Sequence, residues 1–483
     1  MDKDLHSIQE VRNLLLEAKK AQNILATFDQ SALNAICKAL SETAAAHAAE
    51  LAQLACSETG FGVVSDKTLK NQFAAVTVYN AIADLKCIGV LSENKERRTM
   101  DIGVPVGVIA ALVPSTNPTS TVIYKSLIAL KSGNPIVFSP HPGAVNCIRK
   151  TAELLATAAQ KAGAPAGSIS CITMPTLEAT QALMRHPFTR LILATGGGAM
   201  VKAAYSSGTP AIGVGAGNGP AYIHKSADVP RAVSRILDSK TFDNGTICAS
   251  EQSIIVEKAL EPLVTAELQR QNAYLLNEAE KEKLSRFILR GNGTMNPAIV
   301  GRSVQEVATL AGLAGIPQTV RVLVAREDGV GDGHPFSNEK LGLILAYYVE
   351  DDERAVFRRS AEILDYEGAG HTFCIHAEDL DVVRRLALHV PASRVLVNTP
   401  AALGGIGATT NLFPALTLGG GAVGGSSSSN NIGPLDLHNI KRVAWGVREK
   451  SDLKGGEALR NEQSVWSPEL MEQLVSQIMQ KLR

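Results

Sequence analysis

The stretch Leu191-Ile-Leu-Ala-Thr-Gly-Gly-Gly-Ala-Met-Val-Lys-Ala-Ala204 decides the fold class of this chain. Its apolar run predicts a buried strand, its three glycines a turn, and its alanine-rich end a helix. Such a turn lets a ligand approach the backbone, and the first N–H groups of the helix can face a pyrophosphate. The dinucleotide fingerprint G-x-G-x-x-G is incomplete, because Val201 stands where its third glycine belongs. The turn is therefore either a nucleotide site or purely structural.

The same alternation of strand and helix extends to both sides of this stretch. Short runs rich in β-branched residues predict strands at 106–113, 135–139, 169–173, 191–194 and 211–214. Longer helical patterns between them predict helices at 119–131, 144–162, 177–185 and 199–206. This βαβ repetition predicts a parallel sheet with helices on both faces, which binds ligands at the carboxyl ends of its strands.

The segments outside this repeat complete the predicted architecture. Residues 8–28 and 31–56 have helical patterns, and a second α/β lobe is expected from about residue 227 to 414. That lobe has predicted helices at 228–240 and 352–364 and strands at 253–257, 342–349, 372–376 and 394–398. Two α/β lobes usually leave a cleft between them. The segment LGGGAVGGSSSSNN at 418–431 is either a flexible linker or a structured glycine-rich loop, and 441–445 reads as a strand.

Composition excludes several classes of protein. The 483 residues contain 47 Lys plus Arg and 47 Asp plus Glu, and only 4% aromatic residues, which argues against a nucleic-acid binder. The N-terminus lacks the apolar core of a signal peptide, and no apolar run is long enough to span a membrane. The seven cysteines are odd in number and form no C-x-x-C pair, so we expect no disulfide framework, no metal and a reducing cytoplasm.

Two further positions point to chemistry. Cys248 lies in the polar, glycine-containing connection Phe242-Asp-Asn-Gly-Thr-Ile-Cys248, where a thiol can be exposed and activated. Asn117 follows the first predicted strand of the sheet, where its side-chain N–H could donate to a developing oxyanion. The alternatives are an incidental small residue at 248 and a turn residue before proline at 117.

Taken together, these features resemble the aldehyde dehydrogenase superfamily, and most closely its CoA-acylating branch, including the acetaldehyde and propionaldehyde dehydrogenases of bacterial microcompartments. The resemblance covers about residues 10–448. The segments that carry it are Asn117-Pro-Thr-Ser-Thr, Phe138-Ser-Pro-His-Pro, Ala194-Thr-Gly-Gly, Lys202-Ala-Ala-Tyr-Ser-Ser-Gly, Gly213-Val-Gly-Ala-Gly-Asn, Cys248-Ala-Ser-Glu-Gln-Ser, Tyr366-Glu-Gly-Ala-Gly-His-Thr and Ser393-Arg-Val-Leu-Val-Asn.

The resemblance implies a fold of two Rossmann-like α/β lobes, one nucleotide-binding and one catalytic, with a small oligomerisation element. It implies NAD and CoA as cofactor and co-substrate, and no metal. Cys248 would be the nucleophile, and Asn117 with the Cys248 backbone N–H would hold the oxyanion. Glu339 would bind the nicotinamide ribose, and His371 would line the CoA or substrate path or be purely structural. The other implied cofactor-binding residues are Ser115, Thr116, Ser139, Pro140, His141, Thr195, Gly196, Gly197, Gly198 and Gly215.

Two departures from the hydrolytic branch shape the predicted reaction. Hydrolytic members carry a glutamate that activates water, whereas the matching segment Val214-Gly-Ala-Gly-Asn218 has no carboxylate. This favours transfer of the acyl group to CoA, with acetaldehyde as the favoured substrate and propionaldehyde next. Ser139-Pro140-His141 replaces a Lys-Pro that reads the adenosine ribose, which leaves NAD favoured over NADP. The alternative functions are those of a hydrolytic aldehyde dehydrogenase and of a non-catalytic scaffold.

The resemblance also suggests how the chain is divided. We expect a nucleotide-binding domain at 1–226 with oligomerisation strands near 93–105, a catalytic thiol domain at 227–420, and a return segment at 421–448. A homodimer or homotetramer is implied. After a linker at 449–463, residues 464–483 begin with the helix start Ser467-Pro468-Glu469. Apolar residues at near-helical spacing follow, so this helix either docks on its own enzyme or is an encapsulation peptide for microcompartment shell proteins. The expected location is the bacterial cytoplasm, inside a microcompartment.

Overall fold

The computed structural model describes residues 3–291, 294–454 and 468–481. The chain divides into two compact units. The larger unit combines Met1–Gly89 with Gly103–Asn439, and the smaller one combines Val90–Ile102 with Ile440–Arg483. Both predicted α/β lobes lie in the larger unit, so the candidate site residues belong to it.

The first lobe contains a five-stranded parallel sheet in the order β5-β4-β3-β6-β7. Its strands are β3 (Val108–Val113), β4 (Ile136–Pro140), β5 (Ile169–Cys171), β6 (Thr189–Thr195) and β7 (Ala211–Val214). The connecting helices are α6 (Pro118–Lys131), α7 (Val145–Lys161), α8 (Leu177–Arg185) and α9 (Gly198–Tyr205). Every residue of β3 and of α6 is buried, as expected for the centre of a parallel sheet covered on both faces. The predicted βαβ repetition is confirmed.

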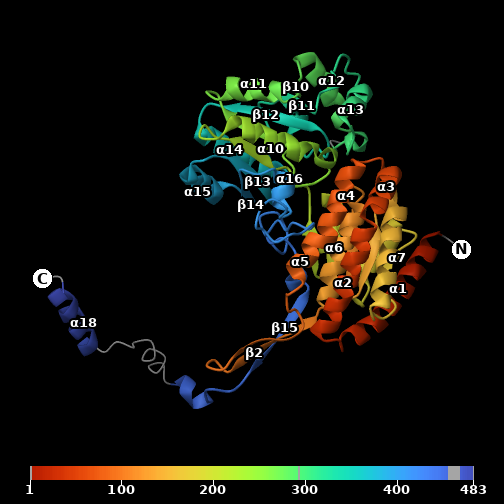
Figure 1. Ribbon diagram of the computed structural model, residues 1–483, viewed down its shortest axis with the longest axis vertical. Helices are drawn as coiled ribbons and strands as arrows, with labels where there is room; N and C mark the ends of the chain where they lie inside the picture. Colours follow the sequence, from red (N-terminus) through yellow and green to blue (C-terminus); the bar gives the residue numbers. More distant parts are fainter. Residues whose placement is uncertain (1–2, 292–293, 455–467, 482–483) are drawn as a thin grey trace. The chain divides into compact units, whose positions relative to one another are not determined.

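Helices from the N-terminal part of the chain pack around this sheet (Figure 1): the first contacts its strands and α8, and the next four contact α6 or α7. They are α1 (Lys3–Leu25), α2 (Gln30–Ala46), α3 (Ala48–Thr59), α4 (Val64–Gln72) and α5 (Val78–Ile82), with a π-helical turn at Phe73–Thr77 between the last two. Asp29 caps the N-terminus of α2, because its carboxylate accepts a hydrogen bond from the Ala32 N–H at 2.8 Å. The helix predicted for 31–56 is in fact two helices, because the backbone leaves helical geometry at His47.

The second lobe contains a seven-stranded parallel sheet in the order β10-β11-β12-β9-β8-β13-β14. Its strands are β8 (Pro220–Ile223), β9 (Ser253–Glu257), β10 (Ala273–Leu275), β11 (Val322–Arg326), β12 (Ile344–Glu350), β13 (Gly370–His376) and β14 (Ala392–Val397). Its helices are α10 (Val229–Thr241), α11 (Glu261–Arg270), α12 (Glu278–Ile288), α13 (Val304–Leu310), α14 (Glu353–Tyr366), α15 (Leu380–His389) and α16 (Ala401–Gly405). The chain passes from the first sheet to the second between Val214 and Pro220. The domain boundary expected at 226 stays a prediction.

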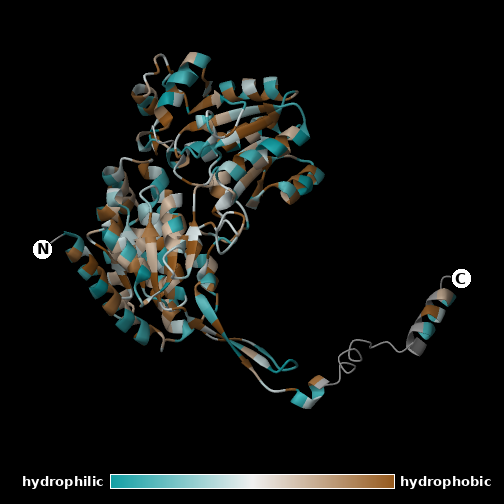
Figure 2. Cartoon of the chain, turned by 180° about the vertical axis from the view of Figure 1, so that it is seen from behind, coloured by the Kyte–Doolittle hydropathy of each residue, from teal (hydrophilic) through white to brown (hydrophobic). Residues whose placement is uncertain are grey.

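Hydropathy follows this layering, since the strands of both sheets are largely hydrophobic, whereas many of the helices carry both hydrophobic and hydrophilic residues (Figure 2). The side chains of α10 show the pattern clearly. Val233, Ile236 and Leu237 are buried against the second sheet, while Arg231 is exposed. Amphipathic helices on apolar parallel strands are what the sequence pattern predicts.

The glycine- and serine-rich segment at 418–431 is a structured loop. The N–H groups of Gly419 and Gly421 donate to the carbonyls of Asn430 and Ser428 at 2.9 and 2.8 Å. Gly370 lies directly against this loop, because a Cβ at residue 370 would come 1.8 Å from the carbonyl oxygen of Gly420. The interpretation of this segment as a flexible linker is therefore wrong.

The third sheet has the order β1-β2-β15, with β1 at Gly89–Asn94, β2 at Thr99–Pro105 and β15 at His438–Ala444. The Arg442 guanidinium bonds to the Asp101 carboxylate at 2.8 Å. The strand predicted at 441–445 is confirmed, and β1 and β2 overlap the strands expected near 93–105. Their role in oligomerisation stays a prediction.

The last part of the chain contains two short helices. A 3₁₀ helix occupies Lys450–Lys454, and α18 occupies Pro468–Lys481, which confirms the helix predicted for the tail. Residues 455–467 of the predicted linker and tail, and residues 482–483, lie outside the described residues.

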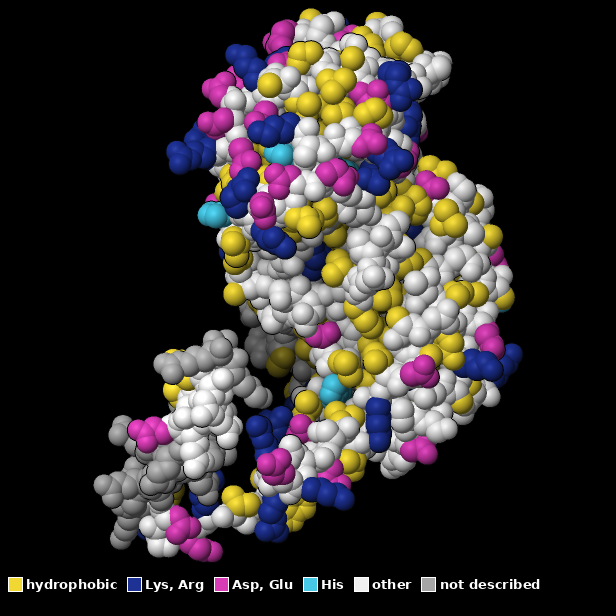
Figure 3. All heavy atoms as spheres, turned by 60° about the vertical axis from the view of Figure 1, so that its left-hand side comes forward, with side chains coloured by type: hydrophobic (Ala, Val, Ile, Leu, Met, Phe, Trp, Pro, Cys, Tyr) yellow, Lys and Arg dark blue, Asp and Glu magenta, His cyan; other side chains and the backbone are white. Residues whose placement is uncertain are grey.

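The mixture of charges on the surface agrees with the equal numbers of acidic and basic residues in the sequence. On the face shown in Figure 3, acidic and basic side chains stand next to one another over the same elements. None of the helices in the described parts of the chain is both long and apolar enough to cross a membrane.

Candidate active site

Residues predicted from the sequence gather at the carboxyl ends of four neighbouring strands. Ser115, Thr116 and Asn117 follow β3, and Ser139 to His141 lie at the end of β4. Thr195 to Gly198 follow β6, and Gly215 follows β7. Because these strands are parallel neighbours, their carboxyl ends lie at one edge of the sheet. The structure thus brings these residues to a common edge.

The turn between β6 and α9 has the features of an anion site. Ideal Cβ atoms built on Gly197, Gly198 and Gly215 would meet no other atom within 4 Å, so the backbone here is open to a ligand. The Thr195 hydroxyl is buried and has no hydrogen-bond partner in the structure, which indicates a missing polar contact. The turn also precedes the N-terminus of α9, where N–H groups point outward. These observations fit a dinucleotide phosphate.

The side chains of Ser139 and His141, at the end of β4, make local hydrogen bonds. The Ser139 hydroxyl pairs with that of Thr180 at 2.9 Å, and His141 Nδ1 accepts the Gly143 N–H at 3.0 Å. The His141 side chain is exposed, so it remains accessible to a ribose or phosphate.

The candidate nucleophile follows an irregular turn. Cys248 lies between the 3₁₀ helix Phe242–Gly245 and β9, and Asp243 and Asn244 adopt φ angles of +48° and +52°. Burial, and secondly the charge of Glu339, raise the pKa of the Cys248 thiol to about 12, although Arg394 opposes them. The loop position is as predicted. Burial favours the protonated form of this thiol, and its activation stays a prediction.

We expect iodoacetamide to alkylate Cys248 slowly at neutral pH, and the rate of alkylation to keep rising beyond pH 10. A thiol with a pKa near 12 is only about one part in a thousand ionised at pH 9. Above about pH 8, where the Glu339 carboxyl group is ionised, Glu339→Gln should accelerate the reaction, since it removes a negative charge that raises the pKa of the thiol. Mass spectrometry of the peptide containing Cys248 measures the rate, with the Cys56 peptide as internal reference. A plateau below pH 9 would contradict the protonated thiol.

Gly217 contacts both Glu339 and Cys248, the candidate nucleophile. The Gly217 N–H donates to Glu339 Oε1 at 2.8 Å, and a Cβ on Gly217 would come 2.0 Å from the Cys248 carbonyl oxygen. Burial and the neighbouring charge of Glu367 raise the pKa of Glu339 to about 8. The segment Val214–Asn218 therefore has no carboxylate of its own but holds one close to the thiol. The sequence did not reveal this contact.

Gly217→Ala is expected to lower the predicted aldehyde-oxidising activity at least about tenfold, because the new methyl group overlaps the Cys248 backbone and displaces the candidate nucleophile from its reactive geometry. Steady-state kinetics and thermal unfolding would measure the effect. Gly291→Ala is the matched control, since a Cβ there meets nothing within 4 Å. Equal activity of the two variants would show that the 217–248 contact is unimportant.

Asn117 links its own loop to the nucleophile loop. It precedes α6, but its side chain does not cap that helix. Instead, its Nδ2 donates to the Thr246 carbonyl at 3.1 Å and to the Thr116 hydroxyl at 3.2 Å, while its Oδ1 accepts a hydrogen bond from Lys70. The interpretation as a simple turn residue is therefore incomplete.

A buried cluster of charges supports this link. Lys67 and Lys70 on α4 both bond to the Asp243 carboxylate, the former at 2.9 Å, and the three side chains are 2% exposed or less. Burial lowers the pKa of Lys70 to about 8, opposed by Asp243. Burial would raise the pKa of Asp243, but the charges of Lys70 and Lys67 lower it overall. These residues were not predicted from the sequence, although two lysines three positions apart on one helix could have indicated a shared binding face.

His371 and Gly215 line a cavity of about 280 Å³ together with the glycine-rich loop. His371 Nδ1 pairs with the Thr372 hydroxyl at 2.9 Å, and its Nε2 is buried without a partner. Burial, and then the Arg394 charge, lower the pKa of His371 to about 3, so the ring is neutral. Arg394 anchors the cavity wall by donating to the carbonyls of His371 and Gly419 at 3.0 and 2.7 Å.

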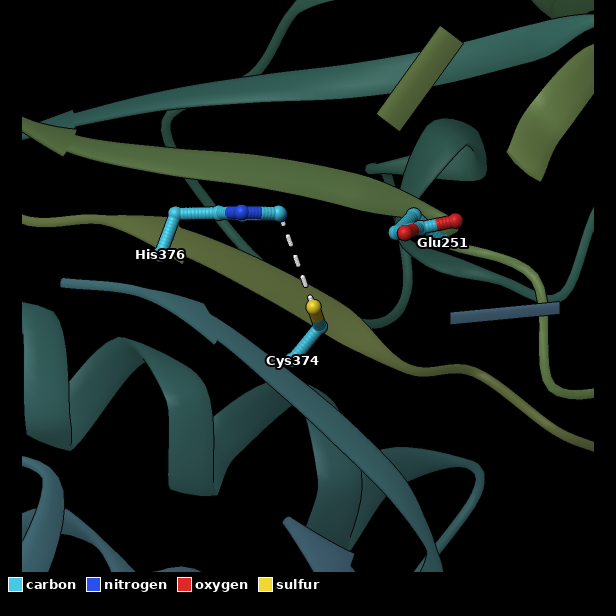
Figure 4. A group of neighbouring side chains, drawn as sticks. All are labelled: Glu251, Cys374 and His376. Atoms are coloured by element: carbon cyan, nitrogen blue, oxygen red, sulfur yellow. Dashed lines mark hydrogen bonds between the residues drawn. The ribbon is translucent and has the colours of Figure 1, made fainter. Parts of the chain in front are cut away.

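Two groups among the described residues could hold a metal ion. Figure 4 shows the buried one, in which the Cys374 thiol and the His376 ring from β13 point toward each other and Glu251 lies nearby. Cys374 Sγ already contacts His376 Nε2 and the Thr399 carbonyl, each at 3.5 Å. Burial raises the pKa of Cys374 and lowers that of His376 to about 3, so these two side chains are neutral. The second group combines the buried Glu327 with the exposed Asp328 and the half-buried His334. The absence of a metal stays a prediction.

Comparisons with known proteins point to one family. Residues 5–283 match the model of the "Aldehyde dehydrogenase family". The chain is 44% identical over 443 residues to the bifunctional aldehyde-alcohol dehydrogenase AdhE of Escherichia coli, covering 91% of this chain but 50% of AdhE. It thus spans about half the length of this relative.

Solved structures match along nearly their whole length. A probable aldehyde dehydrogenase from Listeria monocytogenes has 58% identity and a TM-score of 0.93, covering 94% of this chain and 100% of the other. An acetylating aldehyde dehydrogenase from Geobacillus thermoglucosidasius has 52% identity and a TM-score of 0.91, with coverage of 93% and 99%. A propionaldehyde dehydrogenase from the Clostridium phytofermentans fucose utilisation microcompartment has 26% identity and a TM-score of 0.82, with coverage of 90% and 97%.

Proposed function

Because this chain belongs to the aldehyde dehydrogenase family, we propose that it oxidises a short aldehyde with NAD and CoA to an acyl-CoA and NADH. The observation that carries this proposal is the hydrogen bond between the Asn117 amide and the carbonyl of Thr246, two residues before Cys248. It joins a potential oxyanion donor to the loop of a potential nucleophile. The similarity to an acetylating aldehyde dehydrogenase over nearly its full length supports the acyl-transfer reaction.

The chain's own residues would act in a fixed order. The Cys248 thiol loses its proton to solvent, and the thiolate sulfur adds to the aldehyde carbon. The resulting oxyanion accepts hydrogen bonds from the N–H groups of Asn117 and of the Cys248 backbone. NAD, when bound, supplies the acceptor for the hydride that leaves this carbon. The remaining thioester on Cys248 is attacked by the CoA thiol, which takes the acyl group and restores the free cysteine.

The turn around Thr195, Gly197 and Gly198 is the proposed NAD phosphate site, because it offers an unpartnered hydroxyl and open backbone. NAD is proposed as the cofactor in preference to NADP, because Ser139-Pro140-His141 contains no lysine that could bind a 2′-phosphate. Glu339 is proposed to contact the nicotinamide ribose. His371 is proposed to line the CoA or substrate path, which its unpartnered Nε2 and its place in the cavity support.

The experiment that tests the proposal measures products. Purified protein is incubated with NAD, CoA and aldehydes of two to six carbons, and acyl-CoA is identified by mass spectrometry while NADH is followed by absorbance. We expect one acyl-CoA per NADH and the highest kcat/KM with acetaldehyde, followed by propionaldehyde. NADH accompanied by free acid instead would favour a hydrolytic enzyme, the reaction that the position of Glu339 beside Cys248 keeps as second candidate. No aldehyde oxidation would favour a scaffold.

The tail supports a proposal about location. We propose that the enzyme is a homodimer or homotetramer in the bacterial cytoplasm, inside a microcompartment, and that residues 464–483 bind shell proteins. The helix α18 and the similarity to a microcompartment propionaldehyde dehydrogenase support this assignment. Val475 and Met479 are 56% and 58% exposed, so part of the apolar pattern is available to a partner. Each fully buried aliphatic side chain would contribute roughly 1.5–3 kcal/mol, less the cost of ordering the helix.

Deleting residues 464–483 is expected to leave kcat/KM and the thermal midpoint nearly unchanged but to abolish co-sedimentation with shell proteins. Fusion of residues 449–483 to a fluorescent protein should be sufficient for encapsulation, and a fusion with Val475→Glu and Met479→Glu is the matched control. If shells exclude the intact fusion and the truncated enzyme loses stability, the tail instead docks on its own enzyme.

A further inference from the structure

We propose that Lys70, held in place by Asp243, is a positioning residue that fixes the Asn117 amide for oxyanion binding. The inference rests on the proposed function, because it requires that Asn117 holds an oxyanion formed at Cys248. It adds two residues from distant parts of the chain to the machinery of that reaction.

The Lys70 ammonium group makes a complete set of contacts. Its Nζ donates to Asn117 Oδ1, to Asp243 Oδ2 and to the Thr246 hydroxyl, the last at 3.3 Å. A lysine has three N–H donors and no acceptor, so these bonds use its full capacity. Lys70 therefore contacts both the candidate oxyanion residue and the nucleophile loop.

These contacts determine which way the Asn117 amide faces. With its Oδ1 on Lys70, its Nδ2 donates to the Thr246 carbonyl and the Thr116 hydroxyl, and an oxyanion would take the place of one of these two acceptors. A flipped amide would set NH₂ against the ammonium group and Oδ1 against the carbonyl oxygen, which costs two hydrogen bonds. The ammonium group also polarises the amide, and a polarised N–H is a stronger donor to a negative oxygen. Orientation and donor strength are the two properties that an oxyanion residue needs.

The charge balance of the cluster suits the same role. Lys67, Lys70 and Asp243 are buried and sum to one positive charge, which is opposed by the negative charge of the less buried Asp66, whose carboxylate accepts the Asp243 backbone N–H at 2.8 Å. Lys67 Nζ also donates to the carbonyl of Thr116 at 2.9 Å, next to Asn117. A buried positive charge that is fixed before the reaction stabilises a developing oxyanion without rearrangement.

The backbone on both sides of the contact has rare geometry. The α4 helix that carries Lys70 runs into the π-helical turn Phe73–Thr77, and Asp243 adopts a left-handed conformation. Gly62 packs so closely that a Cβ there would come 1.9 Å from Asp243 Oδ1, which also accepts the Val63 N–H at 2.7 Å. π-turns and left-handed non-glycine residues concentrate at functional sites. Several costly features thus converge on the Asp243 carboxylate.

A double-mutant cycle between Lys70 and Asn117 tests the inference. We expect Asn117→Ala to lower kcat/KM for the aldehyde about 100- to 1,000-fold, as for loss of one oxyanion donor. Lys70→Met alone should lower it about 10- to 100-fold, mainly through kcat, and should cause little further loss in the Asn117→Ala background. Alkylation of Cys248 by iodoacetamide, which forms no oxyanion, should change less than about twofold in Lys70→Met.

Lys131→Met is the matched control. Lys131 is as buried as Lys70 and bonds to Asn34 Oδ1 and the Ala83 carbonyl, at the far end of the helix that Asn117 precedes. If Lys70→Met does not fold, the double variant Lys70→Met/Asp243→Asn replaces Lys70→Met in the cycle. This double variant removes one positive and one negative charge.

The outcomes separate this inference from the proposed function. Full additivity of Lys70→Met and Asn117→Ala, or a Lys70→Met effect no larger than that of Lys131→Met, overturns the positioning role while the enzyme assignment stands. A wild-type protein that forms no acyl-CoA overturns the proposed function and this inference with it. Loss of activity in Lys70→Met with an equal loss of Cys248 alkylation would make Lys70 a structural residue of the nucleophile loop.

Discussion

Cys248→Ala is expected to abolish CoA-dependent NADH formation, with a loss of at least about a thousandfold. Cys248 is the cysteine that lies in the connection before β9, with its carbonyl against Gly217 and its thiol influenced by Glu339 and Arg394. Without a sulfur nucleophile no thioester can form. Steady-state absorbance at saturating aldehyde, NAD and CoA measures the loss.

The fold and NAD binding of this variant should be retained, because the lost side chain is small and the dinucleotide turn lies on the other lobe. Circular dichroism and calorimetric titration with NAD check both. Cys171→Ala is the control, since Cys171 is also half-buried but ends β5 at the far edge of the first sheet. Near-normal turnover in Cys248→Ala would refute the mechanism.

Omission of CoA is expected to reduce steady NADH production at least about a hundredfold, leaving one turnover per active site as a stable thioester. The physical reason is that the segment Val214–Asn218 supplies no base for water, and Glu339, whose pKa is raised to about 8 by burial and Glu367, is mostly protonated at neutral pH. A rapid burst of NADH followed by a near-flat trace is the expected record.

The pH dependence of this experiment distinguishes the two candidate reactions. If Glu339 activates water, NADH release without CoA should rise as pH passes about 8, because the raised pKa leaves the carboxylate form scarce below that value. Glu339→Gln would then remove the rise. Steady release of free acid at a rate comparable with the CoA reaction would establish the hydrolytic function instead.

Local patterns predicted much of the fold. The elements at 177–185, 211–214 and 253–257 match the structure residue for residue, because each is a periodic or continuous apolar run between turn residues. Strands β10 and β11 were missed. β10 has only three residues, and its burial depends on pairing with β11, a contact that no local pattern records.

The candidate site, like the fold, was predicted in part from local sequence patterns. The glycine turn and the cysteine loop have local signals, since special backbone positions need special residues. Lys70 and Asp243 are 173 positions apart, and Gly217 and Glu339 are 122 apart. Such contacts arise only when the two lobes have folded, so neither the charge cluster nor the carboxylate beside the thiol could be predicted from the sequence. The high pKa of Cys248 has the same origin, because burial is a property of the whole fold.

The π-helical turn at Phe73–Thr77 sets a length constraint on the gene. A π-turn contains one residue more than an α-turn, so loss of a single codon there would restore an uninterrupted α-helix from α4 into α5. That change would rotate the residues before the deletion by about 100° relative to the residues after it. Lys67 and Lys70 would then turn away from Asp243 and Asn117 without any of the four being altered. Inheritance of the charge cluster therefore depends on the number of codons between the two helices as much as on the residues that they encode.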